Sequence, residues 1–203
     1  YFGLEAVSAK AITDAFPEDK SDIVLEVNSN GGLVTVGSEI YTALKSYPGH
    51  VTVEVTGMAA SAASVAIMGA DKVVISPTAQ IMIHKALYGY VSGNSDDLDK
   101  ASNALKSSDQ AIVNAYVAKT GLEESVIIDM MKNETFMSAS EAVEKGFADE
   151  VMTFEDIGAV ANLENGLLPQ AVIDDFYANR SKCKSEIQNM LRELEKEELL
   201  RGL

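Results

Sequence analysis

The chain has 203 residues, of which 47% are apolar, enough for one domain with a sizeable core plus an appendage. Its 16 basic and 31 acidic residues give a net charge of -15, which disfavours binding to nucleic acid or to anionic membranes. The single cysteine, Cys183, excludes an internal disulfide, and the longest apolar stretch, residues 58–70, is too short to cross a bilayer. We therefore expect a cytoplasmic protein. Because residue 1 is Tyr, we also expect the natural chain to begin before this numbering.

The first half of the chain is predicted to repeat a strand, a turn and a helix. A helix over residues 4–16 is expected to come first and to end at Pro17. The repeated elements are strand 23–27, helix 36–46, strand 51–55 and helix 59–70, with turns at Asn28–Gly32 and Thr56–Gly57. Two such units in tandem favour an α/β fold with parallel strands and right-handed crossovers.

The second half is predicted to contain short strands, an exposed extended segment and one long helix. The expected elements are strands 72–76 and 80–85, the extended segment 88–95, helices 95–120, 122–132 and 138–145, and a last strand at 149–153. The long helix carries an apolar stripe made of Leu98, Ala101, Leu105, Ala111, Ile112, Ala115 and Tyr116. About seven exposed turns exceed what one face of this domain covers, so we expect a partner to bury part of the stripe.

The sequence changes character near residue 158. We predict a domain of residues 1–157 and an appendage of residues 158–203, with a linker at 162–169. Apolar side chains on one helical face of the final segment stand among many Lys and Glu: Ile187, Met190, Leu191 and Leu194. Two interpretations stay open for it, an amphipathic helix that pairs with another subunit or a solvated tail.

Histidine-dependent chemistry has two candidates in this sequence. His50 follows a Pro-Gly turn and needs no function to explain it. His84 ends the strand of residues 80–84 and shares a strand face with Met82, opposite Ile81 and Ile83. Such a histidine acts as a general base only when a nucleophile lies within reach.

Ser61 is the candidate nucleophile. It follows the second predicted strand and lies in the first turn of the next helix, where unpaired amides and the helix dipole favour developing negative charge. The alternative is that Ser61 and Ser64 are small residues that pack a buried helix. The surrounding residues do not form the Gly-x-Ser-x-Gly motif of α/β hydrolases. The prediction therefore depends on pairing Ser61 with His84.

The Asn28–Gly32 turn is expected to lie beside the turn at Ser61, because both turns follow parallel strands. The backbone amides of Gly32 and Ala62 then form an oxyanion hole. An ordinary tight turn is the alternative. The sequence contains neither a Cys and His cluster nor a His-Glu-x-x-His motif, so we expect no metal and no cofactor.

Five segments, taken in order, carry a further signal. They are Asn28–Val34, Gly57–Ser64, Gln80–His84, Gly89–Gly93 with the long helix after it, and Phe136–Ala142 with Gly146–Asp149. Together they resemble the Clp proteolytic subunit (ClpP) family over about residues 3–153, with Asn30 where the family has proline. The resemblance implies a ClpP/crotonase-type superhelix of repeated strand-turn-helix units with a protruding handle helix.

The resemblance also implies a serine endopeptidase that cleaves peptides or proteins inside a homo-oligomeric chamber of stacked rings. Ser61 would be the nucleophile and His84 the base. The third member of the family's triad is an Asp, whose place is held here by Glu134, and Asp129 is the alternative. Substrate is expected to lie as an added strand along Leu87, Gly89, Tyr90 and Val91.

Two departures from the family bear on partners and role. The family's N-terminal strand and axial loops have no counterpart before Tyr1, which leaves coupling to an ATPase open. The appendage after residue 158 resembles the tailed ClpP-like head-maturation proteases of bacteriophages and prophages. Two rival functions remain, a catalytically silent ring-forming scaffold and an acyl-CoA enzyme of the crotonase fold. The acyl-CoA interpretation leaves Ser61 and His84 without a common purpose.

Overall fold

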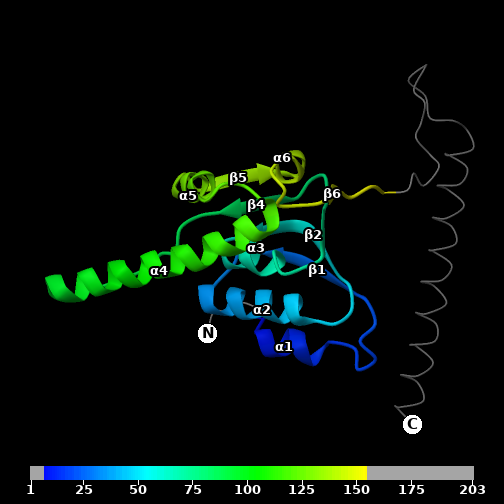
Figure 1. The fold of residues 1–203 in the computed structure, drawn as a ribbon, viewed down its shortest axis with the longest axis horizontal. Helices are drawn as coiled ribbons and strands as arrows, with labels where there is room; N and C mark the ends of the chain where they lie inside the picture. Colours follow the sequence, from blue (N-terminus) through cyan, green and yellow to red (C-terminus); the bar gives the residue numbers. More distant parts are fainter. Residues whose placement is uncertain (1–6, 155–203) are drawn as a thin grey trace, which may run out of the picture. The chain divides into compact units, whose positions relative to one another are not determined.

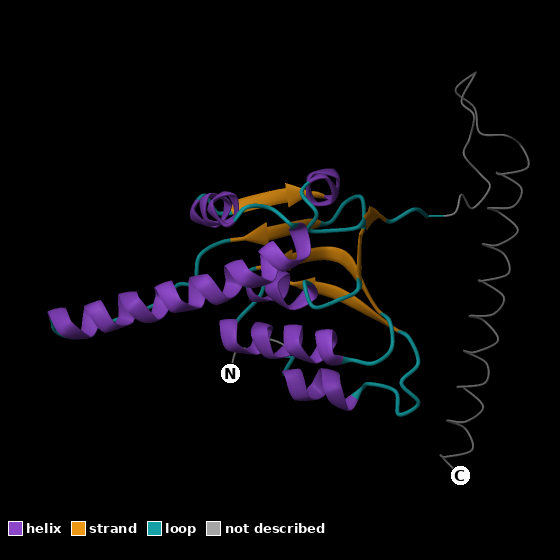
Figure 2. Ribbon diagram, viewed as in Figure 1, coloured by secondary structure: helices purple, strands orange, loops and turns teal. Residues whose placement is uncertain are grey.

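A computed structural model describes residues 7–154, which form a mixed sheet with helices packed around it (Figures 1 and 2). The strands in this part of the chain are β1 Ile23–Ser29, β2 Val51–Ala60, β3 Lys72–Ile75, β4 Gln80–Ile83, β5 Thr135–Ser138 and β6 Glu150–Val151. They follow the order β5-β4-β2-β3-β6, with β1 paired to β2. The pairing of β4 with β5 is antiparallel and the others are parallel. The predicted α/β class is confirmed.

The helices of the described residues are α1 Ala9–Asp14, α2 Val34–Ser46, α3 Ala62–Ile67, α4 Ser95–Thr120, α5 Glu124–Lys132 and α6 Ala139–Glu144. Figure 1 shows α1 and α2 side by side on one side of the strands, and α4 projecting beyond them. None of these helices is both long and apolar enough to span a membrane. The predicted linker and helical appendage, residues 158–203, lie outside the described residues.

Strand β2 is the junction of the sheet. Its first half, residues 52–55, pairs with β3, and its second half, residues 58–60, pairs with β4. The predicted turn at Thr56–Gly57 is therefore wrong, because pairing with β4 extends the strand to Ala60 and delays the next helix to Ala62. The side-chain oxygen of Asn28 accepts a hydrogen bond from the Met58 amide at 3.1 Å, where the register with β1 shifts.

The core lies along β2 and its neighbours. Val51, Val53 and Val55 alternate along β2 and are fully buried, as the two-residue period of a strand requires. Ile81 and Ile83 of β4 are also fully buried. Each such side chain contributes roughly 1.5–3 kcal/mol of burial free energy. This packing fixes the strand ends from which the candidate site is built.

Close packing of α2 on α3 fixes the start of α3. A Cβ at Gly37 would lie 2.5 Å from the Ala62 carbonyl oxygen, and one at Gly69 would run into the Tyr41 carbonyl. A side chain at either position would push the helices apart. Because Ala62 is the first residue of α3, this contact also restrains the turn before it.

Helix α4 agrees with the predicted helix of residues 95–120. Asn94 caps its first turn, forming a capping box with Asp97, and Gly121 ends it with a φ of 68°. Its two halves differ. Residues 95–100 are exposed, whereas the residues it buries lie near its C-terminal end: Ile112, Val113, Ala115 and Tyr116. The expectation that the apolar stripe is exposed along the whole helix is therefore wrong, because the last turns pack on the protein's own core.

Three smaller differences separate prediction from structure. The helix predicted over residues 4–16 is described as Ala9–Asp14, with residues 1–6 outside the description. Strand β5 was not predicted, because its four residues join two helices and give too short a pattern. The last predicted strand shrinks to Glu150–Val151.

Candidate active site

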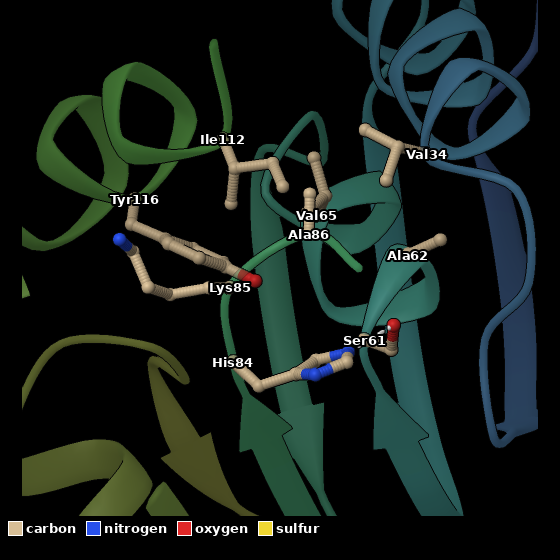
Figure 3. Close-up of a pocket in the computed structure, with 9 residues that line it drawn as sticks. All are labelled: Val34, Ser61, Ala62, Val65, His84, Lys85, Ala86, Ile112 and Tyr116. Carbon is tan, nitrogen blue, oxygen red and sulfur yellow. Dashed lines mark hydrogen bonds between the residues drawn. The ribbon is translucent and has the colours of Figure 1, made fainter. Parts of the chain in front are cut away.

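Ser61 stands between β2 and α3 with an unusual backbone. Its φ of 56° and ψ of -126° lie in a region that side-chain-bearing residues seldom occupy, at a cost of about 1–3 kcal/mol. The surrounding contacts hold it there. The Ser61 amide donates to the Met82 carbonyl at 3.0 Å, which ties the turn to β4. The Ser61 side chain is partly exposed at the C-terminal end of β2, and it borders the pocket shown in Figure 3.

His84 lies one residue beyond the end of β4. Because Ala60 pairs with Met82, the two parallel strands end side by side and bring Ser61 and His84 to one edge. The His84 Nε2 lies 2.6 Å from the Ser61 Oγ (Figure 3). This is the distance that a general base needs in order to take a proton from a hydroxyl.

His50 is far from this arrangement in the sheet. It directly precedes β2, at the opposite end of the strand from Ser61. Its Nδ1 lies 3.7 Å from an Asp71 carboxylate oxygen, and its side chain is 53% exposed. The structure therefore brings together Ser61 and His84, and leaves His50 as a surface residue.

The Asn28–Gly32 turn packs against the turn at Ser61. Gly31 has a φ of 94°, and a Cβ at this position would lie 2.7 Å from the Ser61 Cβ and 2.9 Å from the Ala62 nitrogen. Gly32 has open space where its Cβ would be. Within residues 7–154, the amides of Gly32 and Ala62 donate to no backbone or side-chain acceptor. Both amides stay candidates for an oxyanion hole, and Gly31 allows the two turns to approach closely.

A buried polar contact lies behind the nucleophile. The Ser64 Oγ donates to the Ser61 carbonyl oxygen at 2.6 Å and lies 2.8 Å from the Tyr116 hydroxyl. Ser64 is fully buried, and burial raises the pKa of the Tyr116 phenol, so the phenol keeps its proton. The sequence does not indicate this contact, because Ser64 and Tyr116 are 52 positions apart and each has an ordinary packing explanation.

A small apolar pocket opens beside Ser61 and His84. Its remaining walls are Val34, Ala62, Val65, Lys85, Ala86, Ile112 and Tyr116 (Figure 3). Asp109 of α4 supports one wall of the pocket. Its carboxylate accepts a hydrogen bond from the Ala86 amide at 2.8 Å and forms an ion pair with the Lys85 Nζ at 3.1 Å. The long helix therefore contacts the segment directly after His84.

The third carboxylate is less firmly placed. Ile83 pairs with Thr135 in the antiparallel ladder, and Glu134 directly precedes that strand, so it lies near the end of β4 that His84 follows. Glu134 is exposed and has a φ of 48°. Among the residues that the structure describes, neither Glu134 nor Asp129 forms a hydrogen bond or ion pair with His84. Asp129 lies on α5, also exposed.

The predicted substrate segment lies between β4 and α4. Leu87, Tyr90 and Val91 are 62%, 84% and 39% exposed, and Gly89 is exposed as well. The segment belongs to no strand of the sheet, so its backbone is open to pairing. It begins three residues after His84. In the described part of the chain, no group of three or more His, Cys, Asp or Glu side chains is arranged to hold a metal ion.

The sequence of this chain is similar to those of known proteins. Residues 7–155 match the family described as Clp protease. The ATP-dependent Clp protease proteolytic subunit 1 of Chlamydia trachomatis serovar D is 32% identical over 168 residues, which are 77% of this chain and 88% of that protein. The Chlamydia muridarum subunit 1 is 34% identical over 139 residues, 66% of this chain and 72% of the relative. The ATP-dependent Clp protease proteolytic subunit of Chaetosphaeridium globosum is 36% identical over 138 residues, 66% and 68%.

Proposed function

This chain belongs to the Clp protease family, and from that premise we propose that it is a serine endopeptidase whose acyl-enzyme forms on Ser61. The observation that carries the proposal is the 2.6 Å contact between the His84 Nε2 and the Ser61 Oγ. That contact occurs at a strained turn, and in residues 7–154 the Ala62 and Gly32 amides have no acceptor. A serine that only packs a helix needs none of these features.

The chemistry follows the geometry. The His84 Nε2 takes the Ser61 hydroxyl proton as the Oγ attacks a peptide carbonyl, and the oxyanion accepts hydrogen bonds from the Gly32 and Ala62 amides. The C–N bond then breaks as Nε2 returns the proton to the leaving amine. Water attacks the acyl-enzyme, giving its proton to Nε2, and Ser61 recovers it when the acid product leaves. Each step uses only this chain and water.

Glu134 is proposed to orient His84. For Nε2 to accept a proton, the neutral ring must carry its own proton on Nδ1, and a carboxylate beside Nδ1 favours that tautomer. Glu134 directly precedes β5, the strand paired with β4, and this placement supports the role. Asp129 is the alternative, although it is on a helix and not on the paired strand.

The pocket supports a preference among substrates. Its walls include Val34, Val65, Ile112 and the Tyr116 ring, and its volume is only about 10 Å³. We therefore propose that it widens on binding to take an apolar side chain just before the scissile bond. The substrate backbone is proposed to pair as an added strand with the exposed segment at Leu87, Gly89, Tyr90 and Val91. A fluorogenic peptide with Leu at the cleaved position is therefore the first substrate to test.

We also propose a cytoplasmic homo-oligomer of stacked rings, in which the exposed half of α4 contacts another copy. The relatives are named ATP-dependent, and dependence of this chain on an ATPase is a further proposal, to be tested by adding such a partner. A narrower role in bacteriophage or prophage head maturation is supported only by the sequence after residue 158.

A serine-reactive fluorophosphonate tests the nucleophile directly. We expect it to label Ser61, as located by mass spectrometry, and to block peptide hydrolysis. Ser61→Ala and His84→Ala should each abolish hydrolysis while leaving particle size unchanged, and combining them should add little, because the two groups act as one unit. His50→Ala is the matched control and should be silent.

Three results would overturn the proposal. Substantial hydrolysis by Ser61→Ala protein would exclude Ser61 as nucleophile. Absence of both labelling and hydrolysis in the wild-type assembly would favour the silent scaffold. Turnover of an acyl-CoA substrate by the unlabelled protein would favour the crotonase-type enzyme.

A further inference from the structure

The Ser61 turn is supported from behind by a chain of three polar groups. The Ser64 Oγ lies 2.6 Å from the Ser61 carbonyl oxygen and 2.8 Å from the Tyr116 hydroxyl. Both residues are buried: the exposed fraction is 0% for Ser64 and 1% for Tyr116. Neither takes part in the proposed chemistry, and a buried polar pair of this kind needs an explanation, because apolar residues would fill the same space at less risk.

The direction of these bonds follows from the groups themselves. A carbonyl oxygen only accepts, so the single Ser64 proton is committed to Ser61. The Ser64 oxygen is then the acceptor for the Tyr116 hydroxyl, which keeps its proton because the phenol is buried. The result is a one-way chain in which Tyr116 donates to Ser64 and Ser64 donates to Ser61. In such a chain each bond polarises and strengthens the next.

The Ser61 carbonyl and the Ala62 amide belong to one planar peptide unit. In a trans peptide the C=O and N–H bonds point in opposite directions, so holding the oxygen on one side aims the amide hydrogen to the other. The Ser61 carbonyl also accepts from the amides of Ser64 at 3.0 Å and Val65 at 3.3 Å, as the short helix α3 dictates. The hydroxyl bond is the shortest of the three and links this peptide to α4.

We propose that Ser64 and Tyr116 are positioning residues that orient the Ser61–Ala62 peptide so that the Ala62 amide faces the oxyanion. The proposal rests on the proposed peptidase function and on Ala62 as an oxyanion donor. The strained φ and ψ of Ser61 make such support necessary, because an unusual backbone persists only where its surroundings determine it. Tyr116 also forms a wall of the pocket, so its contact connects the long helix to the nucleophile turn.

The test uses Ser64→Ala, Tyr116→Phe and the double variant in the full-length assembly. Ser64→Ala leaves the buried phenol without a partner and should lower both the melting temperature and kcat. The double variant removes both hydroxyls, so its melting temperature should recover while kcat stays low, by about tenfold relative to wild type, with KM little changed. Tyr116→Phe alone keeps the Ser64 bond to Ser61 and should lower kcat by about threefold or less.

A peptide boronate supplies a readout that a purely structural role would not change. Its adduct with Ser61 is tetrahedral and places an oxygen where the oxyanion forms. We expect its affinity for the double variant to fall by the same factor as kcat, while affinity for the product peptide stays constant. Thr42→Val is the matched control, because it removes a similar helical bond, from the Thr42 hydroxyl to the Ser38 carbonyl at 2.9 Å, in α2.

The outcomes separate this inference from the proposed function. A wild-type protein that neither hydrolyses peptide nor reacts with fluorophosphonate removes the function itself. An active wild type whose double variant has wild-type kcat and boronate affinity overturns the positioning role alone. If Ser64→Ala does not fold, the double variant and Tyr116→Phe still decide the question, since neither leaves an unpaired buried phenol.

Discussion

The groups on the two sides of the His84 ring are held in place to different degrees. On the Nε2 side, Ser61 is fixed by the Met82 carbonyl, by the close approach of Gly31 and by the buried Ser64 hydroxyl. For the third role, Glu134 directly precedes the strand paired with β4, but it is exposed and forms no bond to the His84 ring within the described residues. The proposed nucleophile is thus held in place by contacts within this chain. For the proposed carboxylate, we predict that substrate or assembly completes the contact with His84.

The largest effect on kcat is expected at Gly31, where the two turns pack most closely beside Ser61. Gly31→Ala places a methyl group 2.7 Å from the Ser61 Cβ and 2.9 Å from the Ala62 nitrogen, so one of the turns must move. We expect kcat to fall by about a hundredfold or more, since displacement of about 1 Å at a reacting centre costs that much. Steady-state kinetics of the peptide substrate measure this.

Gly121→Ala is the control for backbone strain. Gly121 also has a positive φ, 68°, but a Cβ there would meet no neighbouring atom. This variant should lower the melting temperature while leaving kcat unchanged. Equal losses of kcat in both variants would show that general destabilisation, and not crowding at Ser61, is responsible.

The next largest effect is expected at Glu134, the proposed carboxylate partner of His84. Glu134→Gln removes the charge proposed to stabilise the imidazolium, and we expect kcat to fall about tenfold. That is far less than the roughly 10⁴-fold loss caused by neutralising a buried triad aspartate, because the Glu134 side chain is exposed. Asp129→Asn should change kcat little. The reverse ranking would assign the third role to Asp129, and no effect from either would indicate a Ser-His dyad.

The sequence predicted the Ser61 and His84 pairing because each residue ends a strand or begins a helix in a repeated unit. Parallel neighbours bring such ends together, and the structure places the two side chains in contact. The third partner was harder to place. It depends on the antiparallel strand β5, whose four residues are too few to give a recognisable pattern.

Tertiary contacts explain the other failures. Gly57 after a run of alternating residues resembles a turn, yet β2 continues through it because β4 offers a second partner. The Ser64 and Tyr116 contact joins α3 to α4, and no local pattern indicates which helix faces will meet. Likewise, the apolar stripe of α4 is a sequence fact, but only the fold shows that its last turns pack internally while the first stay exposed.

A smaller effect is expected from the link between α4 and the segment after His84. Asp109→Ala leaves the Ala86 amide without its 2.8 Å acceptor and should lower kcat by about fivefold, because a partly buried donor loses its bond. Asp109→Asn keeps an acceptor and loses only the ion pair to the 47%-exposed Lys85, so we expect a change of about threefold or less. Equal losses would mean that the charge, and not the hydrogen bond, positions this segment.

The smallest effect on chemistry, and the largest on particle size, is expected at the exposed half of α4. Leu98 is 48% exposed near the start of the helix, where the described part of the chain leaves every residue from 95 to 100 exposed. If another copy covers this face, Leu98→Glu buries a charge in that contact and should yield smaller particles by light scattering. Hydrolysis should fall only a few-fold, because Ser61 and the groups that hold it lie within one protomer. The activity that is lost should be the part that depends on Glu134.

Combining Leu98→Glu with Glu134→Gln therefore tests the comparison between the two sides of His84: the double variant should be little slower than the slower single variant. Ala115 is unsuitable for this experiment, since at 6% exposure a charge there would disrupt the protomer's own core. Lys106→Glu, at another exposed position of the same helix, controls for added charge. Wild-type protein that is fully active as a monomer would exclude both the chamber and any completion of the site by assembly.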